Sequence, residues 1–269
     1  MRKLFTLAIA LAAFAAFGGT ATASHSWATY HWARTSNPFT IKVINANTPA
    51  WSGQLDEAIA GWNNAPQLYS PFTPRWLASP VLNVVKESGA ADKRCRAVAG
   101  KVKSCNGSYG QNGWLGLAQI WLSGGHISQG TAKMNDTYFS MSAYSDPIKR
   151  QHVMCQEIGH TWGLGHQSET GADKDTCMDY SSKLDNPEPN YHDFEQLDAI
   201  YALLDTSTTI ATGLAGTGSA KPVRIDRNDR IADSIITEHF QDGTQRITHV
   251  FWALETRGHA AEHAFDHNG

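Results

Sequence analysis

The sequence predicts a mixed α+β domain with a short extension at its C-terminal end. Alternating apolar and polar side chains over 39–44 predict a strand, and residues 51–63 then carry Leu, Ile and Trp at helical spacing. Apolar runs over 81–85 and 115–122 predict two further strands. With helices predicted over 147–162 and 191–204, the order strand, helix, strands, helix, helix is typical of an α+β or α/β domain of about 180 residues.

The composition is that of an ordinary globular protein, with 41% hydrophobic and 17% charged residues among 269. The formal net charge is -3, and it becomes -5 (20 basic against 25 acidic residues) if Arg2 and Lys3 are removed. This balance argues against a partner such as nucleic acid or an anionic membrane. We expect a monomer with no stable membrane association.

The first 23 residues have the pattern of a secretion signal. Arg2 and Lys3 precede an apolar stretch over 4–17, and Ala21-Thr22-Ala23 is a small-x-small cleavage site. The alternative is an uncleaved anchor, but the stretch is shorter than the roughly 20 residues that a membrane-spanning helix needs. We therefore expect a mature chain from about Ser24, located outside the cytoplasm, in the medium or the periplasm.

The four cysteines predict two disulfides in such a compartment. Cys95 and Cys105 are close in sequence and would staple a loop, which leaves Cys155 to pair with Cys177. A cysteine-based metal site is the alternative, but no CxxC spacing supports it.

Two segments are predicted to form a loop and a short edge strand. Residues 95–113 are rich in Gly, Lys and Asn and are predicted to form a loop. Residues Gly124 to Asn135 are predicted to contain a short edge strand, because glycines and polar side chains suit an exposed position. Asp193 is the predicted N-cap of the last helix, whose apolar face would be formed by Leu197, Ile200 and Leu204.

The domain is predicted to occupy 24–205, and 206–269 to form a linker and a C-terminal extension. Residues 206–220 are rich in Thr, Gly, Ala and Ser, which is typical of a linker. Strands are predicted over 223–225 and 248–253, with Asp242-Gly243 as a hairpin turn.

The chemistry is concentrated in 155–166, which reads Cys-Gln-Glu-Ile-Gly-His-Thr-Trp-Gly-Leu-Gly-His. Gln156 and His160 are four residues apart, so on a helix both side chains can reach one ion. Gly163 permits a left-handed turn that ends the helix and lets the chain return His166 to the same ion. A catalytic zinc typically takes three protein ligands, and Glu157 lies beside them without being one.

These residues resemble the metzincin motif HExxHxxGxxH, with Gln156 in place of the first histidine. Met178 and Tyr180 in Cys-Met-Asp-Tyr-Ser resemble the family's Met-turn, and the chain is similar to matrixin-type domains over about 28–204. The resemblance implies a twisted mixed sheet with an antiparallel edge strand, an active-site helix and a C-terminal helix.

The resemblance also implies a secreted zinc metalloprotease that holds one catalytic zinc through His160, His166 and Gln156. Glu157 would be the general base of peptide-bond hydrolysis, and the edge strand near 124–135 would bind substrate by strand addition. Tyr180 would ligate the metal or hydrogen-bond the oxyanion, or else only pack in the Met-turn.

Because an amide oxygen is a weaker ligand than imidazole, the alternative is an inactive pseudopeptidase that serves as a binding protein. His152 is two helical turns from His160, roughly 12 Å along the axis, and cannot replace the missing ligand. His192 is a further candidate ligand, and a surface position is the alternative. The acidic loop over 173–175 is a candidate calcium site, and a solvated loop is the alternative.

Overall fold

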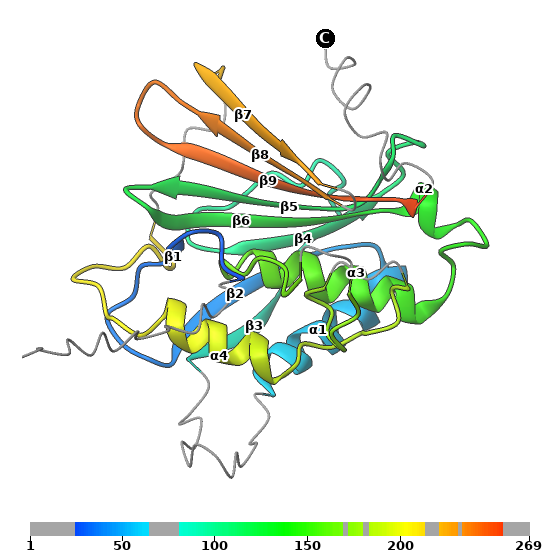
Figure 1. Cartoon of the computed structure of the whole chain (residues 1–269), viewed down its shortest axis with the longest axis horizontal. Coiled ribbons are helices and arrows are strands. Elements are labelled where there is room, and N and C mark those ends of the chain that lie inside the picture. Colours follow the sequence, from blue (N-terminus) through cyan, green and yellow to red (C-terminus); the bar gives the residue numbers. More distant parts are fainter. Residues whose placement is uncertain are drawn as a thin grey trace, which may run out of the picture.

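The computed structural model describes residues 25–64, 81–168, 172–179, 183–212, 221–230 and 233–254. The predicted signal peptide, most of the predicted linker and Tyr180 lie outside these residues. The described part is a mixed α+β structure in which three helices pack on one face of a mostly open mixed sheet (Figure 1).

The strands are β1 (His31–Trp32), β2 (Phe39–Ala46), β3 (Leu82–Ser88), β4 (Val102–Gly107), β5 (Trp114–Ser123), β6 (His126–Asn135), β7 (Arg224–Asp229), β8 (Asp233–His239) and β9 (Gln245–Trp252). The helices are η1 (Pro49–Trp51), α1 (Ser52–Asn63), α2 (Asp136–Phe139), α3 (Pro147–His160) and α4 (Tyr191–Ile200). The sheet order is β3-β2-β4-β6-β5-β9-β8-β7, and β1 also pairs with β6. Strands β2, β3, β4 and β6 run parallel to their neighbours in this group, whereas every pairing from β6 through β5 to β7 is antiparallel.

Two predictions about the middle of the chain were wrong. Residues 95–113 are not all loop, because β4 runs through them with five of its six residues buried between β2 and β6. The strand predicted at the edge is β6, which is ten residues long and lies between β4 and β5. Its polar residues Ser128, Gln129 and Thr131 are buried. The polar side chains of this strand therefore did not indicate a solvent-exposed position. Since both sides of β6 are paired, it cannot accept a substrate strand as predicted.

The extension continues the same sheet. β9 pairs with β5 along nearly its whole length, and β8 and β7 follow outward. The predicted hairpin turn is confirmed between β8 and β9: Gly243 has φ +80°, and the backbone amide of Thr244 donates to the Asp242 side chain. The strand β8 was not predicted. The antiparallel strand β5, which would otherwise end the sheet, is therefore covered by the extension.

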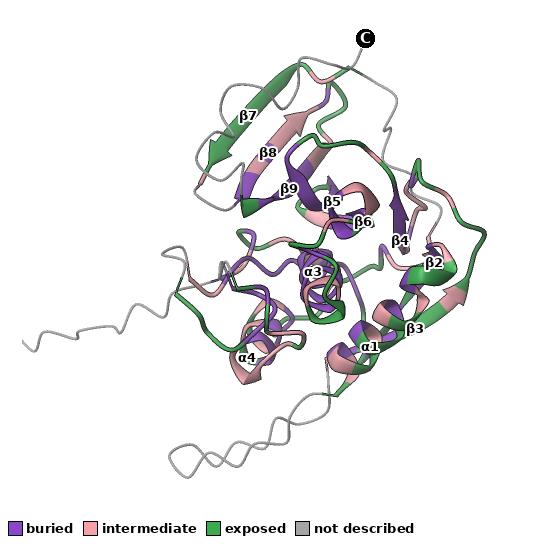
Figure 2. Ribbon diagram, turned by 90° about the vertical axis from the view of Figure 1, so that its right-hand side faces the viewer, coloured by how far each residue is buried: buried purple, intermediate pink, exposed green. Residues whose placement is uncertain are grey.

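Helix α3 lies at the centre of the core. Pro147 begins it at the first turn, the Asp146 side chain caps it by accepting from Ile148, and every residue from 151 to 160 is buried (Figure 2). The predicted N-cap of α4 was wrong, because Asn190 caps the helix. Asp193 is the third helical residue, and its side chain completes a capping box by accepting from the backbone amide of Asn190. The helix ends at Ile200, and Leu204 is exposed because it lies beyond that end.

Both predicted disulfides are confirmed, Cys95–Cys105 and Cys155–Cys177. The second joins α3 directly to the segment that carries Met178. Two disulfides are compatible with an oxidising compartment. Within the described ranges, no helix is both long enough and apolar enough to cross a membrane.

Candidate metal centre

Two histidines reach the site from α3 and the turn that follows it. His160 is the last residue of α3, and Gly163 has φ +94°, which a residue with a side chain rarely adopts. A Cβ at Gly163 would also lie 2.3 Å from the carbonyl oxygen of Tyr30. The predicted left-handed turn is thus present, and it returns the chain so that the rings of His160 and His166 lie 4.8 Å apart.

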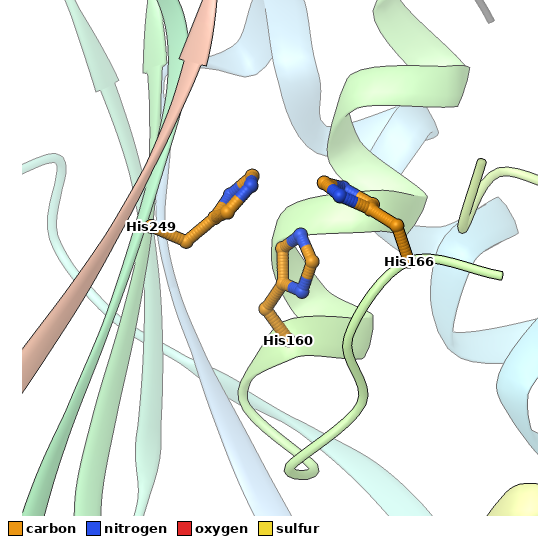
Figure 3. A group of neighbouring side chains, drawn as sticks. All are labelled: His160, His166 and His249. Carbon is orange, nitrogen blue, oxygen red and sulfur yellow. The ribbon is translucent and has the colours of Figure 1, made fainter. Parts of the chain in front are cut away.

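The third histidine comes from the extension. His249 on β9 points at the other two, and one ligand atom from each of the three lies within 4.8 Å of the others (Figure 3). All three side chains are buried, His160 and His249 completely. His249 was not singled out from the sequence, because nothing in the spacing of the motif relates it to α3. The one available signal was a histidine inside the apolar strand predicted over 248–253.

The ring nitrogens of two histidines are arranged as in metal-ligating imidazoles. Nδ1 of His160 lies 2.8 Å from the carbonyl oxygen of Leu164, and Nε2 of His249 lies 2.9 Å from Oδ2 of Asp233. In the neutral rings these acceptors take the N–H of those nitrogens, which leaves lone pairs on Nε2 of His160 and Nδ1 of His249. Both atoms are buried, and neither has a hydrogen-bond partner among the described residues. A set of three imidazoles fits zinc or a similar first-row transition ion.

Two buried carboxylates complete the centre. Oε2 of Glu157 lies 3.7 Å from Nδ1 of His249, and Asp233 contacts both His249 and His166, the latter at 3.7 Å. Gly116 on β5 makes room for the glutamate, since a Cβ there would lie 2.4 Å from Oε1 of Glu157. Glu157 therefore faces the histidines from α3, as the motif predicts, and Asp233 orients His249 from behind.

Replacing Asp233 with Asn is expected to lower the zinc affinity about 10- to 100-fold, which is the usual cost of losing a group that orients a ligating histidine. Competition titration with a chromophoric chelator measures this. Asp226→Asn, on the exposed strand β7, is the matched control. An unchanged affinity in Asp233→Asn would mean that His249 does not bind the metal.

Gln156, the predicted third ligand, has its amide nitrogen committed elsewhere. Nε2 donates to the carbonyl oxygens of Cys177 and Asp179, at 2.8 and 3.0 Å. These carbonyls flank Met178, so the side chain braces the Met-turn beneath α3. Oε1 is buried and has no hydrogen-bond partner within the described residues. A three-histidine site does not require Gln156 as a ligand.

Replacing Gln156 with Ala is expected to lower the free energy of unfolding of the metal-free protein by about 1–3 kcal/mol, because the two buried carbonyls lose their donor. Urea unfolding measures the change, with Gln54→Ala on the half-exposed face of α1 as the control. Equal effects of the two substitutions would argue against the bracing role.

The two predicted residues of the Met-turn are Met178 and Tyr180. Met178 is buried, and its carbonyl oxygen accepts from the backbone amide of Gln167 at 2.8 Å, which ties the Met-turn to the residue after His166. Tyr180 lies outside the described residues, so its catalytic role stays a prediction.

The other candidate ligands do not belong to the three-histidine group. The ring of His152 is 6.2 Å from that of Phe251, and His192 pairs with Glu195 at 3.3 Å near the surface. Neither belongs to a described group that could hold a metal. In the weighed calcium loop, the carboxylate of Asp173 accepts from Lys183 and Asn186, each at 2.8 Å, which fits an acidic surface loop.

The charges of the centre are strongly coupled. Burial on its own would lower the pKa of His249, but Asp233 and Glu157 outweigh it and raise that pKa to about 9. Burial raises the pKa of Glu157, and facing His249 offsets this only in part. Burial, reinforced by the charge on His249, lowers the pKa of His160 and His166 well below the usual value. In the metal-free centre, His249 is therefore the histidine that carries a second proton.

This distribution predicts how metal binding depends on pH. His160 and His166 are already neutral, but His249 must lose one proton before Nδ1 can bind a metal. Below the pKa of His249, near 9, the zinc affinity should fall about tenfold for each pH unit and level off above it. Chelator competition at a series of pH values measures the slope. A zinc affinity that does not change with pH between neutrality and that pKa would show that metal binding displaces no proton from His249.

A cavity of about 250 Å³ leads to the centre. Trp27 and Tyr30 from the N-terminal segment line it together with His166, Asp233 and residues of the extension. The indole of Trp27 stacks on the ring of His160, with centroids 5.1 Å apart and planes 12° apart. The N-terminal segment and the extension thus form the walls of the route to the metal.

No model of a known protein family matches the chain, and no curated protein matches it either. The functional proposal therefore depends on the motif and on the geometry of the centre.

Proposed function

We propose that this protein is a secreted zinc-dependent hydrolase of the metzincin type that cleaves peptide bonds. The observation that carries the proposal is the convergence of His160, His166 and His249 beside the buried carboxylate of Glu157. The resemblance of 156–166 and 177–181 to the metzincin motif and Met-turn supports it. The new element relative to that resemblance is the ligand set, in which His249 takes the place that the motif assigns to position 156.

In this function His160, His166 and His249 hold the metal, and Asp233 and the Leu164 carbonyl fix two of their rings. Zinc bound there supplies Lewis acidity, which acidifies a water and polarises the substrate carbonyl. Glu157 takes the proton of the attacking water and passes it to the leaving amine.

Substrate access follows from the covered sheet edge. Since β9 pairs with β5, an extended peptide cannot add to β5 while the extension stays in place. The cavity of about 250 Å³ is at the small end for ligand sites, so it would admit a short peptide segment or a chain end in preference to a long strand.

The complete burial of Glu157 and of two histidines favours a second candidate, a binding protein in which the metal is structural. Structural zinc sites are closed, whereas catalytic sites leave one position for water or substrate. This candidate keeps the same three ligands but gives Glu157 no proton to transfer.

Hydrolysis of a mixed peptide library by the mature protein, read by mass spectrometry, separates the two. We expect new peptide termini with zinc-loaded protein, their loss after chelation and their return when zinc is restored. Stoichiometric zinc with no cleavage under any loading would favour the structural role. Cleavage that survives complete removal of metal would contradict both.

A further inference from the structure

A second cluster of metal-binding side chains lies away from the candidate centre, at the N-terminal end of β6. His31 on β1 and His126 on β6 are direct register partners in a parallel pair, so their side chains leave the sheet on the same face. Asp205, which follows α4, joins them: one ligand atom from each of the three lies within 4.8 Å of the others. The three side chains are 16–34% exposed, so an ion can reach them from solvent.

The hydrogen bonding of His31 indicates a cation in this cluster. Nδ1 lies 2.7 Å from the carbonyl oxygen of Thr29, and Nε2 lies 3.3 Å from Oδ1 of Asp205. Both neighbours are acceptors, whereas a neutral imidazole has only one N–H to donate. The short contact to Thr29 takes that N–H, which leaves a lone pair on Nε2 facing a carboxylate. A metal ion between the two atoms would satisfy both of them.

The distances fit a shared metal ion. Oδ1 of Asp205 lies 3.3 Å from His31 Nε2 and 3.1 Å from His126 Nε2. Ligand atoms on a tetrahedral zinc with bonds of about 2.0–2.1 Å are about 3.3 Å apart.

Asp205 is held in place by its other oxygen. Oδ2 accepts from the backbone amide and from Nη1 of Arg34, at 3.1 and 2.9 Å. The backbone amide of Asp205 in turn donates to the Arg34 carbonyl oxygen at 2.9 Å. These bonds aim Oδ1 at the two histidines and keep the carboxylate ionised, as a ligand must be.

We propose that His31, His126 and Asp205 form a second binding site for a divalent transition-metal ion, with zinc as the best fit to two imidazoles and one carboxylate. The site joins β1, β6 and the segment after α4, so the bound ion staples the N-terminal segment to the sheet. That segment carries Trp27 and Tyr30, which line the cavity leading to the first centre. The site is structural, and its existence does not depend on the proposed hydrolase function.

The test is a zinc titration of metal-free mature protein at slightly alkaline pH, read by calorimetry and by elemental analysis after gel filtration. We expect two equivalents for the wild type and one for His126→Ala. His249→Ala, which removes a ligand of the first centre, should keep the second site, and zinc should still raise its melting temperature. His192→Ala, a surface histidine outside both clusters, is the matched control and should bind two equivalents.

The number of zinc equivalents bound by each variant decides whether the second site exists. If His126→Ala binds as many equivalents as the wild type, the second site is overturned. If His126→Ala loses one equivalent while His249→Ala loses none, the second site stands and the first centre fails. Should His126→Ala prove unfolded, His31→Gln keeps a neutral side chain on the strand and must show the same loss of one equivalent.

Discussion

Replacing His249 with Ala is expected to lower the zinc affinity of the first centre by at least about 100-fold, since even losing a group that only orients a ligand costs 10- to 100-fold. The reason is that His249 supplies one of the three imidazoles from a fully buried position. The substitution also leaves Asp233 buried without its partner, which will lower stability. Chelator competition measures the affinity.

The matched control for this prediction is Gln156→Ala. It removes the residue that the motif places in the first ligand position, and it leaves all three histidines intact. We expect its zinc affinity to stay within about tenfold of the wild type, because Gln156 donates to the carbonyl oxygens on either side of Met178. The opposite ranking, with Gln156→Ala losing zinc and His249→Ala retaining it, would restore the ligand set expected from the motif alone.

Replacing Glu157 with Gln is expected to lower the rate of peptide hydrolysis about 10²- to 10⁴-fold, the usual contribution of a general base. The amide has nearly the same shape, so it fits the space that Gly116 leaves and should not disturb the histidines. Turnover of a peptide identified from the library measures the rate, and elemental analysis on the same sample measures the metal content.

Zinc content tells two explanations of a loss apart. A variant that keeps its zinc and loses turnover supports Glu157 as the base. A variant that loses zinc as well would mean that the glutamate acts through the metal site, and turnover at the wild-type level would exclude it as the base.

The parts of the site that are local in sequence could be predicted. His160, Gly163 and His166 lie within one helix end and its turn, and their spacing alone brings the two histidines together. The disulfide between Cys155 and Cys177 followed from simple pairing in a chain with four cysteines.

The parts that depend on tertiary pairing could not. His249 and Asp233 reach the centre only because β9 pairs with β5 and β8 pairs with β9, and no local pattern specifies which strand lies beside which. For the same reason β6 was placed at an edge: its polar residues are buried by neighbours that come from distant parts of the chain. Gln156 fits the ligand position by spacing, but no local pattern specifies that its amide nitrogen donates to the carbonyl oxygens of Cys177 and Asp179.

The most direct test of the three-histidine centre is a crystal structure of the zinc-loaded protein with anomalous diffraction data collected at the zinc edge. We expect a peak about 2.0–2.1 Å from Nε2 of His160 and from Nδ1 of His249, with His166 as the third ligand. A peak bonded to Oε1 of Gln156, with His249 remote from it, would contradict the centre described above.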